Sequence, residues 1–204
     1  MQIIYDIIIF LFFLVYLPYF LFRRKINKDF FTRLGFIPQE LKKCLKDKSV
    51  IWLHAVSVGE LIAARSFIEE LKKEFPDKIL LISTVTLTAN NLAKSIYTGD
   101  TVIYSPIDFS FIVKKFVRVI SPCLYLCMET EIWPNIITEL KKNNIPIIII
   151  NGRISDKSFR GYKKIKFILK NILNEIDIFS MQTMRDQERI INLGIDKNKV
   201  LITG

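Results

Sequence analysis

The chain has 204 residues, of which 50% are hydrophobic and 25% charged, so it is long enough to bury a sizeable core and is not generally disordered. With 7 glycines and 7 prolines, a collagen-like or low-complexity composition is excluded. The net charge of +10 is typical of proteins that bind nucleic acid, an anionic membrane surface or an anionic substrate. Residues 1–50 carry nine basic and four acidic side chains, residues 51–150 ten of each, and residues 151–204 eleven and six.

Residues 3–22, IIYDIIIFLFFLVYLPYFLF, predict a membrane segment with one charged residue, Asp6. The apolar run after Asp6 has sixteen residues, slightly short of the roughly 20 that span a bilayer, so a spanning helix and a helix lying in the interface are both compatible with it. Basic flanks stay on the cytoplasmic side of a membrane. We therefore predict a membrane anchor over residues 1–25, with the bulk of the chain facing the cytoplasm. The basic residues that flank the run are Arg23, Arg24 and Lys25.

Residues 26–48 form an amphipathic connector in which phenylalanine and leucine side chains alternate with charges. Two interpretations stay open. The apolar side chains can form a stripe that packs onto the following domain, or they can line a groove for a lipid chain near the bilayer.

From residue 49 onward, short apolar runs alternate with segments of helical periodicity. Strands this apolar are usually covered on both faces, so we predict a parallel sheet between two layers of helices, a Rossmann-like α/β domain over residues 49–204. Ligands of such sheets collect at the C-terminal ends of the strands. The predicted strands are 50–54, 78–83, 101–104, 123–128, 145–150, 176–180 and 199–203. The helical segments with the clearest periodicity are 60–75, 109–120 and 156–174.

Three polar motifs follow predicted strands. In the first, residues 54–60, a glycine turn delivers Glu60 to the first turn of a helix, where the helix dipole keeps a carboxylate ionised; this suits a base and equally an ordinary helix-start acid. In the second, Glu129 and Glu131 emerge from an apolar strand, where burial is costly unless the acids are paired or used. In the third, residues 151–155, Arg153 can hold an anion, while Ser155 can simply cap a helix.

Metal and nucleotide chemistry receive little support from the sequence. Three cysteines and one histidine leave few ligands for a structural metal, and His54 has no companion at ligand spacing. We predict no metal and no cofactor. A glycine-rich phosphate loop is not present either, so nucleotide hydrolysis is not indicated.

The three motifs, WLHAVSVGE at 52–60, METEIWPN at 128–135 and NGRISDKSFRGY at 151–162, together resemble the N-terminal half of the 3-deoxy-D-manno-octulosonic acid (Kdo) transferases of lipopolysaccharide synthesis. The similarity covers nearly the whole chain, including RLGF at 33–36. It implies the acceptor-binding, N-terminal domain of a two-domain GT-B glycosyltransferase at the cytoplasmic face of the inner membrane. The acceptor implied is lipid IVA, the donor is CMP-Kdo, and no nucleic acid partner is expected.

The resemblance also implies roles for individual residues. Glu60 matches the general base that deprotonates the acceptor hydroxyl, and Glu129 matches the acid associated with transition-state stabilisation. Further motif positions are expected to bind substrate or support the site, and these are Ser57, Gly59, Glu131, Trp133, Asn135, Asn151 and Arg153.

The charge of the last quarter of the chain fits this resemblance, because lipid IVA carries two phosphates and sits in an anionic leaflet. In segment 156–174, basic side chains group on one side, opposite an apolar side that includes Ile165. Such a face is typical of a helix on a membrane surface, although an ordinary solvated face has the same pattern. The residues we expect to face the membrane are Arg23, Arg24, Lys25, Lys163, Lys164, Lys166 and Phe167.

The family pattern continues beyond residue 204 into a donor-binding domain that this sequence does not contain. We therefore expect the 204-residue chain to be inactive alone. The alternative is a membrane-anchored, non-catalytic α/β module that binds anionic lipid. The number of Kdo units transferred and the oligomeric state are not predicted.

Overall fold

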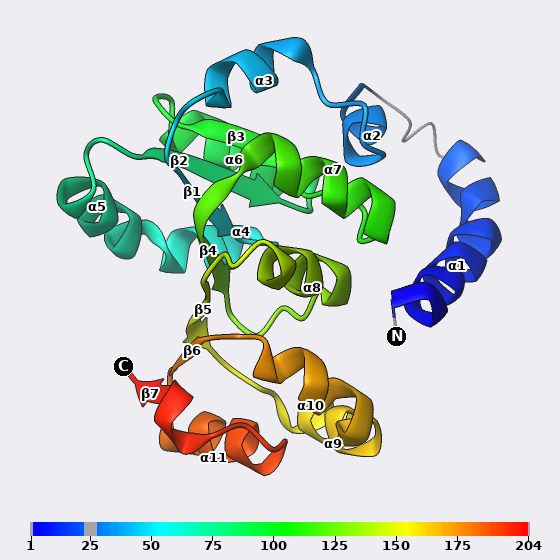
Figure 1. Ribbon diagram of the computed structural model, residues 1–204, viewed down its shortest axis with the longest axis vertical. Helices are drawn as coiled ribbons and strands as arrows, with labels where there is room; N and C mark the ends of the chain where they lie inside the picture. Colours follow the sequence, from blue (N-terminus) through cyan, green and yellow to red (C-terminus); the bar gives the residue numbers. More distant parts are fainter. Residues whose placement is uncertain (1, 23–27, 204) are drawn as a thin grey trace.

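The computed structural model describes residues 2–22 and 28–203 and is built around a parallel sheet of seven strands in the order β3-β2-β1-β4-β5-β6-β7 (Figure 1). This confirms the predicted Rossmann-like parallel α/β architecture and all seven strands, whose ends lie within two residues of the predicted ones. The strands are β1 (Val50–His54), β2 (Ile79–Thr84), β3 (Thr101–Tyr104), β4 (Pro122–Met128), β5 (Ile147–Gly152), β6 (Ile178–Met181) and β7 (Val200–Ile202).

Two layers of helices cover the sheet because successive residues of each strand face opposite sides. In β1, Ile51 and Leu53 join one buried cluster, whereas Val50 and Trp52 join the other. The first cluster is covered by α4 (Val58–Ala63), α5 (Arg65–Glu74) and α6 (Leu87–Ile96). The second is covered chiefly by α7 (Ser110–Ile120), α8 (Pro134–Lys142), α10 (Lys166–Asn174) and α11 (Met184–Asn192), with α9 (Asp156–Lys164) alongside.

Two predicted helices are interrupted in the structure. The segment 60–75 divides at Ala64, which is fully buried and whose N–H contacts the carbonyls of both Glu60 and Ile62 as α4 ends. The segment 156–174 divides at Ile165, where the tightened turn leaves the side chain 47% exposed. Helical periodicity therefore does not carry across the break, and Ile165, expected on the apolar side opposite the basic residues, is exposed like Lys163, Lys164 and Lys166.

The connector contains α2 (Lys28–Arg33) and α3 (Gln39–Leu45). Its apolar stripe packs onto the domain, with Ile37 and Leu45 in the larger core cluster and Leu34 and Leu41 against it, as the first interpretation predicts. A hollow of about 370 Å³, lined in part by Leu41 and Tyr104, also lies between the connector and β3. Its use by a lipid chain stays a prediction.

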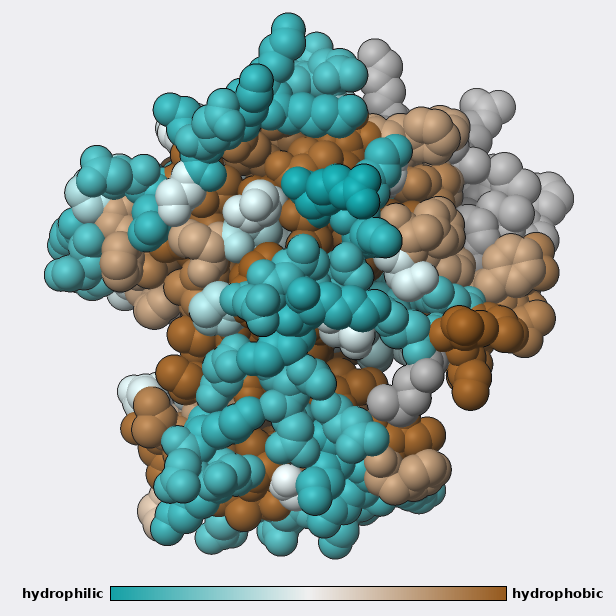
Figure 2. Space-filling model, viewed as in Figure 1, coloured by the Kyte–Doolittle hydropathy of each residue, from teal (hydrophilic) through white to brown (hydrophobic). Residues whose placement is uncertain are grey.

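The N-terminal segment is helix α1 (Gln2–Phe22), and apolar side chains gather over it in Figure 2. Within the described residues, no helix combines the length and apolar character needed to cross a membrane. The structure thus leaves the predicted anchor unconfirmed. Arg23, Arg24 and Lys25 lie outside the described residues. Finally, a short 3₁₀ helix, η1 (Lys197–Lys199), precedes β7.

Candidate functional site

The strand order reverses between β1 and β4. After β1 the chain passes into the α4–α6 layer, whereas after β4 it passes into the opposite layer. The crevice outside the C-terminal ends of two such strands is the usual ligand site of a doubly wound sheet. Glu60 follows β1 and Glu129 follows β4, so the topology brings the first two sequence motifs to this one place. Arg153 follows the neighbouring strand, β5.

Glu60 is held in a fixed position at the start of α4. Ser57 is the N-cap; its hydroxyl accepts from the Glu60 N–H at 3.3 Å and donates to Glu60 Oε1 at 2.8 Å. The Val56 N–H donates to Glu60 Oε2 at 2.8 Å. This is a capping box, in which the helix start and the carboxylate fix each other.

The electrostatics of Glu60 differ from the helix-dipole expectation. Glu60 is 6% exposed, and burial raises its pKa above the ordinary value. The hydrogen bonds from Val56 and Ser57 counteract this shift, and repulsion from Glu129 adds to it. A carboxylate with a raised pKa binds a proton more readily than an exposed glutamate does, which suits a general base.

Glu129 occupies the first position after β4 with a left-handed backbone, φ 54°. Such a conformation is uncommon for residues other than glycine and marks positions where the surrounding structure imposes the geometry. Its N–H donates to the Ile150 carbonyl at 2.9 Å, which ties the ends of β4 and β5 together. Its carboxylate lies 3.9 Å from the Arg153 guanidinium.

The third motif contains a second residue with a left-handed backbone. This is Asn151, which has φ 55° and is the last residue but one of β5. The structure confirms that Ser155 caps α9, because its hydroxyl accepts from the Ser158 N–H at 3.1 Å. Arg153 is 62% exposed beside Glu129, and its binding of an anion stays a prediction. Asp186 was not predicted. It accepts from the Ile154 N–H at 2.8 Å and so fixes the loop that carries Arg153.

Glu131 belongs to the same acidic group. Burial raises its pKa, and repulsion from Glu60 and then from Glu129 adds to the shift. Its carbonyl accepts from the buried Cys127 thiol at 3.4 Å, which holds the loop to the end of β4. Glu60, Glu129 and Glu131 therefore lie close enough for their charges to act on one another, beyond the C-terminal ends of β1 and β4.

Trp133 packs inward rather than projecting into solvent. Its ring meets the ring of the fully buried His54 edge-on, with centroids 5.9 Å apart. His54 Nδ1 is 2.8 Å from Ser83 Oγ, and burial lowers the pKa of His54 to about 4, so the imidazole is neutral. Within the described residues, His54 Nε2 and Trp133 Nε1 are buried with no hydrogen-bond partner.

Asn135 is fully buried, and its amide is used inside the protein. Its Nδ2 donates to the Asp108 carbonyl at 2.5 Å and to Asp6 Oδ1 at 2.8 Å. The Asp108 carboxylate in turn accepts the Asn135 and Ile136 N–H groups at 3.2 and 3.0 Å and caps α8. A buried acidic cap after the strand 101–104 was not predicted, although an aspartate at a strand end is a recognisable capping signal.

Gly59 does not act as the flexible turn that the sequence suggests. It is the second residue of α4, and an added Cβ would meet only Ser57 Oγ at 3.9 Å, an ordinary contact. The fold therefore does not require glycine here. Gly59 is exposed, so a methyl group at this position would enter open space next to Ser57 and Glu60.

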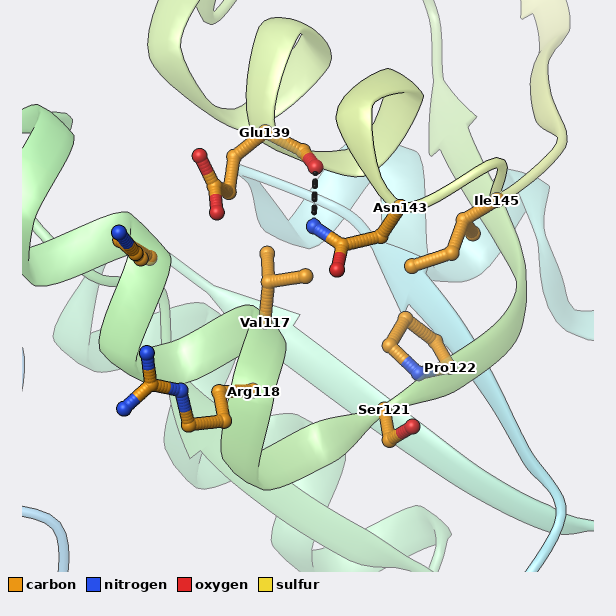
Figure 3. Close-up of a pocket in the computed structure, with 8 residues that line it drawn as sticks. Val117, Arg118, Ser121, Pro122, Glu139, Asn143 and Ile145 are labelled. Atoms are coloured by element: carbon orange, nitrogen blue, oxygen red, sulfur yellow. Dashed lines mark hydrogen bonds between the residues drawn. The ribbon is translucent and has the colours of Figure 1, made fainter.

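Other hollows lie away from this site. A cavity of about 340 Å³ opens between α7 and α8 beside Pro122, where β4 begins, at the opposite edge of the sheet (Figure 3). The Asn143 amide donates to the Glu139 carbonyl at 2.8 Å there. Within residues 2–22 and 28–203, no group of three or more histidine, cysteine or acidic side chains is arranged to hold a metal ion.

Among the residues expected to face the membrane, those of α9 and α10 are described by the structure and are exposed. Lys163 and Lys164 are the last two residues of α9, while Lys166 and Phe167 begin α10, and Phe167 is 76% exposed. The exposed Ile165 and Ile168 extend the apolar part of this surface. Lys164 is also exposed.

Comparison with known proteins places these motifs in a family context. A family model described as 3-deoxy-D-manno-octulosonic-acid transferase (kdotransferase) matches residues 28–204. A bifunctional glycosyltransferase/methyltransferase of Fusobacterium nucleatum is 42% identical over 76% of this chain and 25% of its own length. The 3-deoxy-D-manno-octulosonic acid transferases of Haemophilus influenzae and Chlamydophila psittaci are 37% and 31% identical, over 76% and 98% of this chain. The chain spans only 36% and 47% of those two relatives.

Solved structures share the fold at low identity. A UDP-N-acetylglucosamine 2-epimerase from Listeria monocytogenes has a TM-score of 0.56 at 10% identity, covering 77% of this chain and 44% of that one. The enzyme from Neisseria meningitidis bound to UDP-GlcNAc has a TM-score of 0.56 at 13% identity, covering 76% and 46%. These likenesses support the Rossmann-like fold alone.

Proposed function

We propose a function from the premise that the chain belongs to the 3-deoxy-D-manno-octulosonic acid (Kdo) transferase family. The full protein transfers Kdo from CMP-Kdo to the distal glucosamine hydroxyl of lipid IVA. This chain supplies the half that binds the acceptor and carries the base, and a second domain, in the GT-B arrangement, holds most of the donor. The chain spans 36% and 47% of two transferase relatives, so we expect transfer to need more of the protein than these 204 residues.

The position and environment of Glu60 carry the proposal. The residue lies at the switch point of the sheet, is 6% exposed, and accepts two hydrogen bonds that fix its carboxylate. In the reaction Glu60 takes the proton of the acceptor hydroxyl while that oxygen attacks the anomeric carbon of Kdo. The bond from that carbon to the CMP phosphate breaks, and CMP leaves with the electron pair. A positioned base of this kind contributes about 10²–10⁴-fold to the rate.

Glu129 and Arg153 support the same step from the β4–β5 side. Positive charge develops at the anomeric carbon as the leaving group departs. The Glu129 carboxylate stabilises that charge, and its orientation is set by the left-handed backbone and by the guanidinium 3.9 Å away. Arg153 is mostly exposed, so it can also contact an anionic group of a substrate.

The protein is proposed to work at the cytoplasmic face of the inner membrane. Apolar side chains exposed along α1 and the basic, aromatic surface at the α9–α10 junction support this placement. Basic residues near an anionic leaflet are each worth about 1 kcal/mol of binding. The same charges favour an acceptor that carries two phosphates.

The test uses the complete protein and measures CMP release that depends on both CMP-Kdo and lipid IVA. Glu60→Ala is expected to lower kcat about 10²–10⁴-fold. Glu70→Ala is a matched control, because Glu70 is exposed on α5 and pairs only with a surface lysine, Lys73. Full activity in Glu60→Ala would exclude the base assignment. Lipid binding without any CMP release would support the non-catalytic lipid-binding module instead.

A further inference from the structure

Asp6 is the charged residue of the α1 sequence, and its carboxylate is bound by the α/β domain. Oδ1 accepts from the Ser110 N–H at 3.1 Å and from Asn135 Nδ2 at 2.8 Å, and Oδ2 accepts from the Ser110 hydroxyl at 2.5 Å. An acidic residue in so apolar a segment is costly unless it is paired or has a function. The three hydrogen bonds supply the pairing and attach the start of α1 to the domain.

The attachment lies at the same edge of the sheet as the candidate site. Ser110 is the first residue of α7 and Asn135 the second residue of α8, and these helices follow β3 and β4. A carboxylate at such helix starts is favoured by both helix dipoles. Gln2 adds two contacts, donating to Asn135 Oδ1 at 3.4 Å and accepting from Lys142 Nζ at 2.7 Å. Figure 1 shows the start of α1 beside α7 and α8.

The contact continues into the loop that carries the acidic residues. Asn135 binds Asp6 and the Asp108 carbonyl with the same amide group, and the Asp108 carboxylate caps the first turn of α8. Trp133 immediately precedes that helix, and Glu131 lies two residues further back. The position of Asp6 is therefore transmitted through Asn135 to the loop 129–133.

We propose that Asp6 is a positioning residue that clasps α1 to the site edge of the sheet and, through Asn135, holds the loop 129–133 in the geometry that receives the acceptor. In this arrangement the apolar helix α1 lies at the same edge of the sheet as the candidate site, which is the edge formed by the C-terminal ends of the strands. A lipid acceptor in the membrane would therefore reach the site beside α1. The acceptor part of this inference rests on the proposed function. The clasp itself rests on the contacts.

The experiment compares Asp6→Asn with Asp47→Asn in the complete protein. An asparagine at position 6 can place its amide oxygen where Oδ1 lies, so the bonds from the Ser110 N–H and Asn135 Nδ2 remain but become neutral. Its NH₂ then replaces Oδ2, and the Ser110 hydroxyl loses its acceptor. Asp47 is exposed and has φ 58°, a conformation that asparagine tolerates well, so this control removes an equal charge without strain. Hydrogen exchange of the peptides covering 105–113 and 129–138 is measured together with kcat and the KM of each substrate.

Asp6→Asn should speed exchange in both peptides about tenfold, because the bond donated by the Ser110 hydroxyl is lost and the other two lose their charge. The KM for lipid IVA in vesicles should rise by a similar factor, with kcat and the KM for CMP-Kdo within about twofold of the parent. Unchanged exchange would overturn the clasp. Faster exchange with a lower kcat and an unchanged acceptor KM would overturn the positioning role. If the parent protein has no transferase activity, the proposed function fails while the exchange result still decides the clasp.

Discussion

Replacing Glu60 with glutamine isolates the charge of the candidate base, because the side chain keeps its size. The amide oxygen can accept from the Val56 N–H, and the amide NH₂ can donate to Ser57 Oγ, whose second lone pair remains available. Both hydrogen bonds of the capping box are then replaced by neutral ones, which are roughly half as strong as charge-assisted bonds.

The expected effect on stability is small because two contributions oppose each other. Weaker hydrogen bonds destabilise the variant by about 1 kcal/mol. Removal of the charge also relieves burial of an ionised group and its repulsion with Glu129, which are the causes that raise the pKa of Glu60. Because the pKa is raised in the folded state, ionisation of Glu60 costs stability as pH rises through that pKa, and glutamine avoids this cost. The net change is within about 1 kcal/mol of the parent.

The effect on catalysis is expected to be far larger than the effect on stability. Glutamine cannot accept the hydroxyl proton, so kcat should fall about 10²–10⁴-fold. The assay is CMP release under saturating CMP-Kdo and lipid IVA, with thermal unfolding measured on the same preparations. A variant that folds like the parent and retains activity within about tenfold would refute the argument that Glu60 is the base.

Three further predictions follow from the same geometry. Gly59→Ala should stabilise α4 by up to about 1 kcal/mol in thermal unfolding. It should also lower kcat/KM, because the added methyl group enters the open space beside Glu60. Unchanged kinetics would show that no ligand uses that space. Lys163, Lys164 and Lys166 can be changed together to glutamate in protein lacking residues 1–25. The affinity for anionic vesicles, measured by co-sedimentation, should fall at least about 100-fold, because each lysine contributes about 1 kcal/mol. Equal affinity would contradict the predicted membrane face. Burial raises the pKa of Asp108 from 3.8 to about 7, so its contribution to stability is lost as pH rises through that range. The parent should therefore lose more unfolding free energy than Asp108→Asn over this range, and equal losses would contradict the shift.

Much of the fold is predictable from the apolar pattern of the chain. Strands such as 50–54 and 78–83 are apolar without alternation, because both faces of the sheet are covered. The breaks at Ala64 and Ile165 were not predictable from periodicity, since the apolar residues keep helical spacing on both sides of each break. They depend on how the second part of each helix packs, and that is a tertiary effect.

The site was predictable in its charged members and less so in its neighbours. Glu60 and Glu129 follow apolar strands, and the parallel topology brings such residues to one edge. Asn135 belongs to the same motif as Glu129, but its amide is buried between Asp6 and Asp108, and both of these residues are far from it in sequence. Motif spacing specifies which residues lie near one another along the chain. Asp6 and Asp108 instead reach Asn135 through the packing of α1 and of the β3–α7 loop.

The distribution of charge constrains how an anionic acceptor can approach. Residues 51–150 are neutral overall and contain the convergent acids Glu60, Glu129 and Glu131, whereas the basic excess lies on either side of this segment in the sequence. Phosphate groups are repelled by the three carboxylates and attracted by the lysines of α9 and α10. A hydroxyl is not repelled, and it can donate to a carboxylate. Under the proposed function, a phosphorylated lipid presents its sugar hydroxyl to Glu60 while its phosphates stay outside the group of three carboxylates, so the site selects by charge the group that reacts.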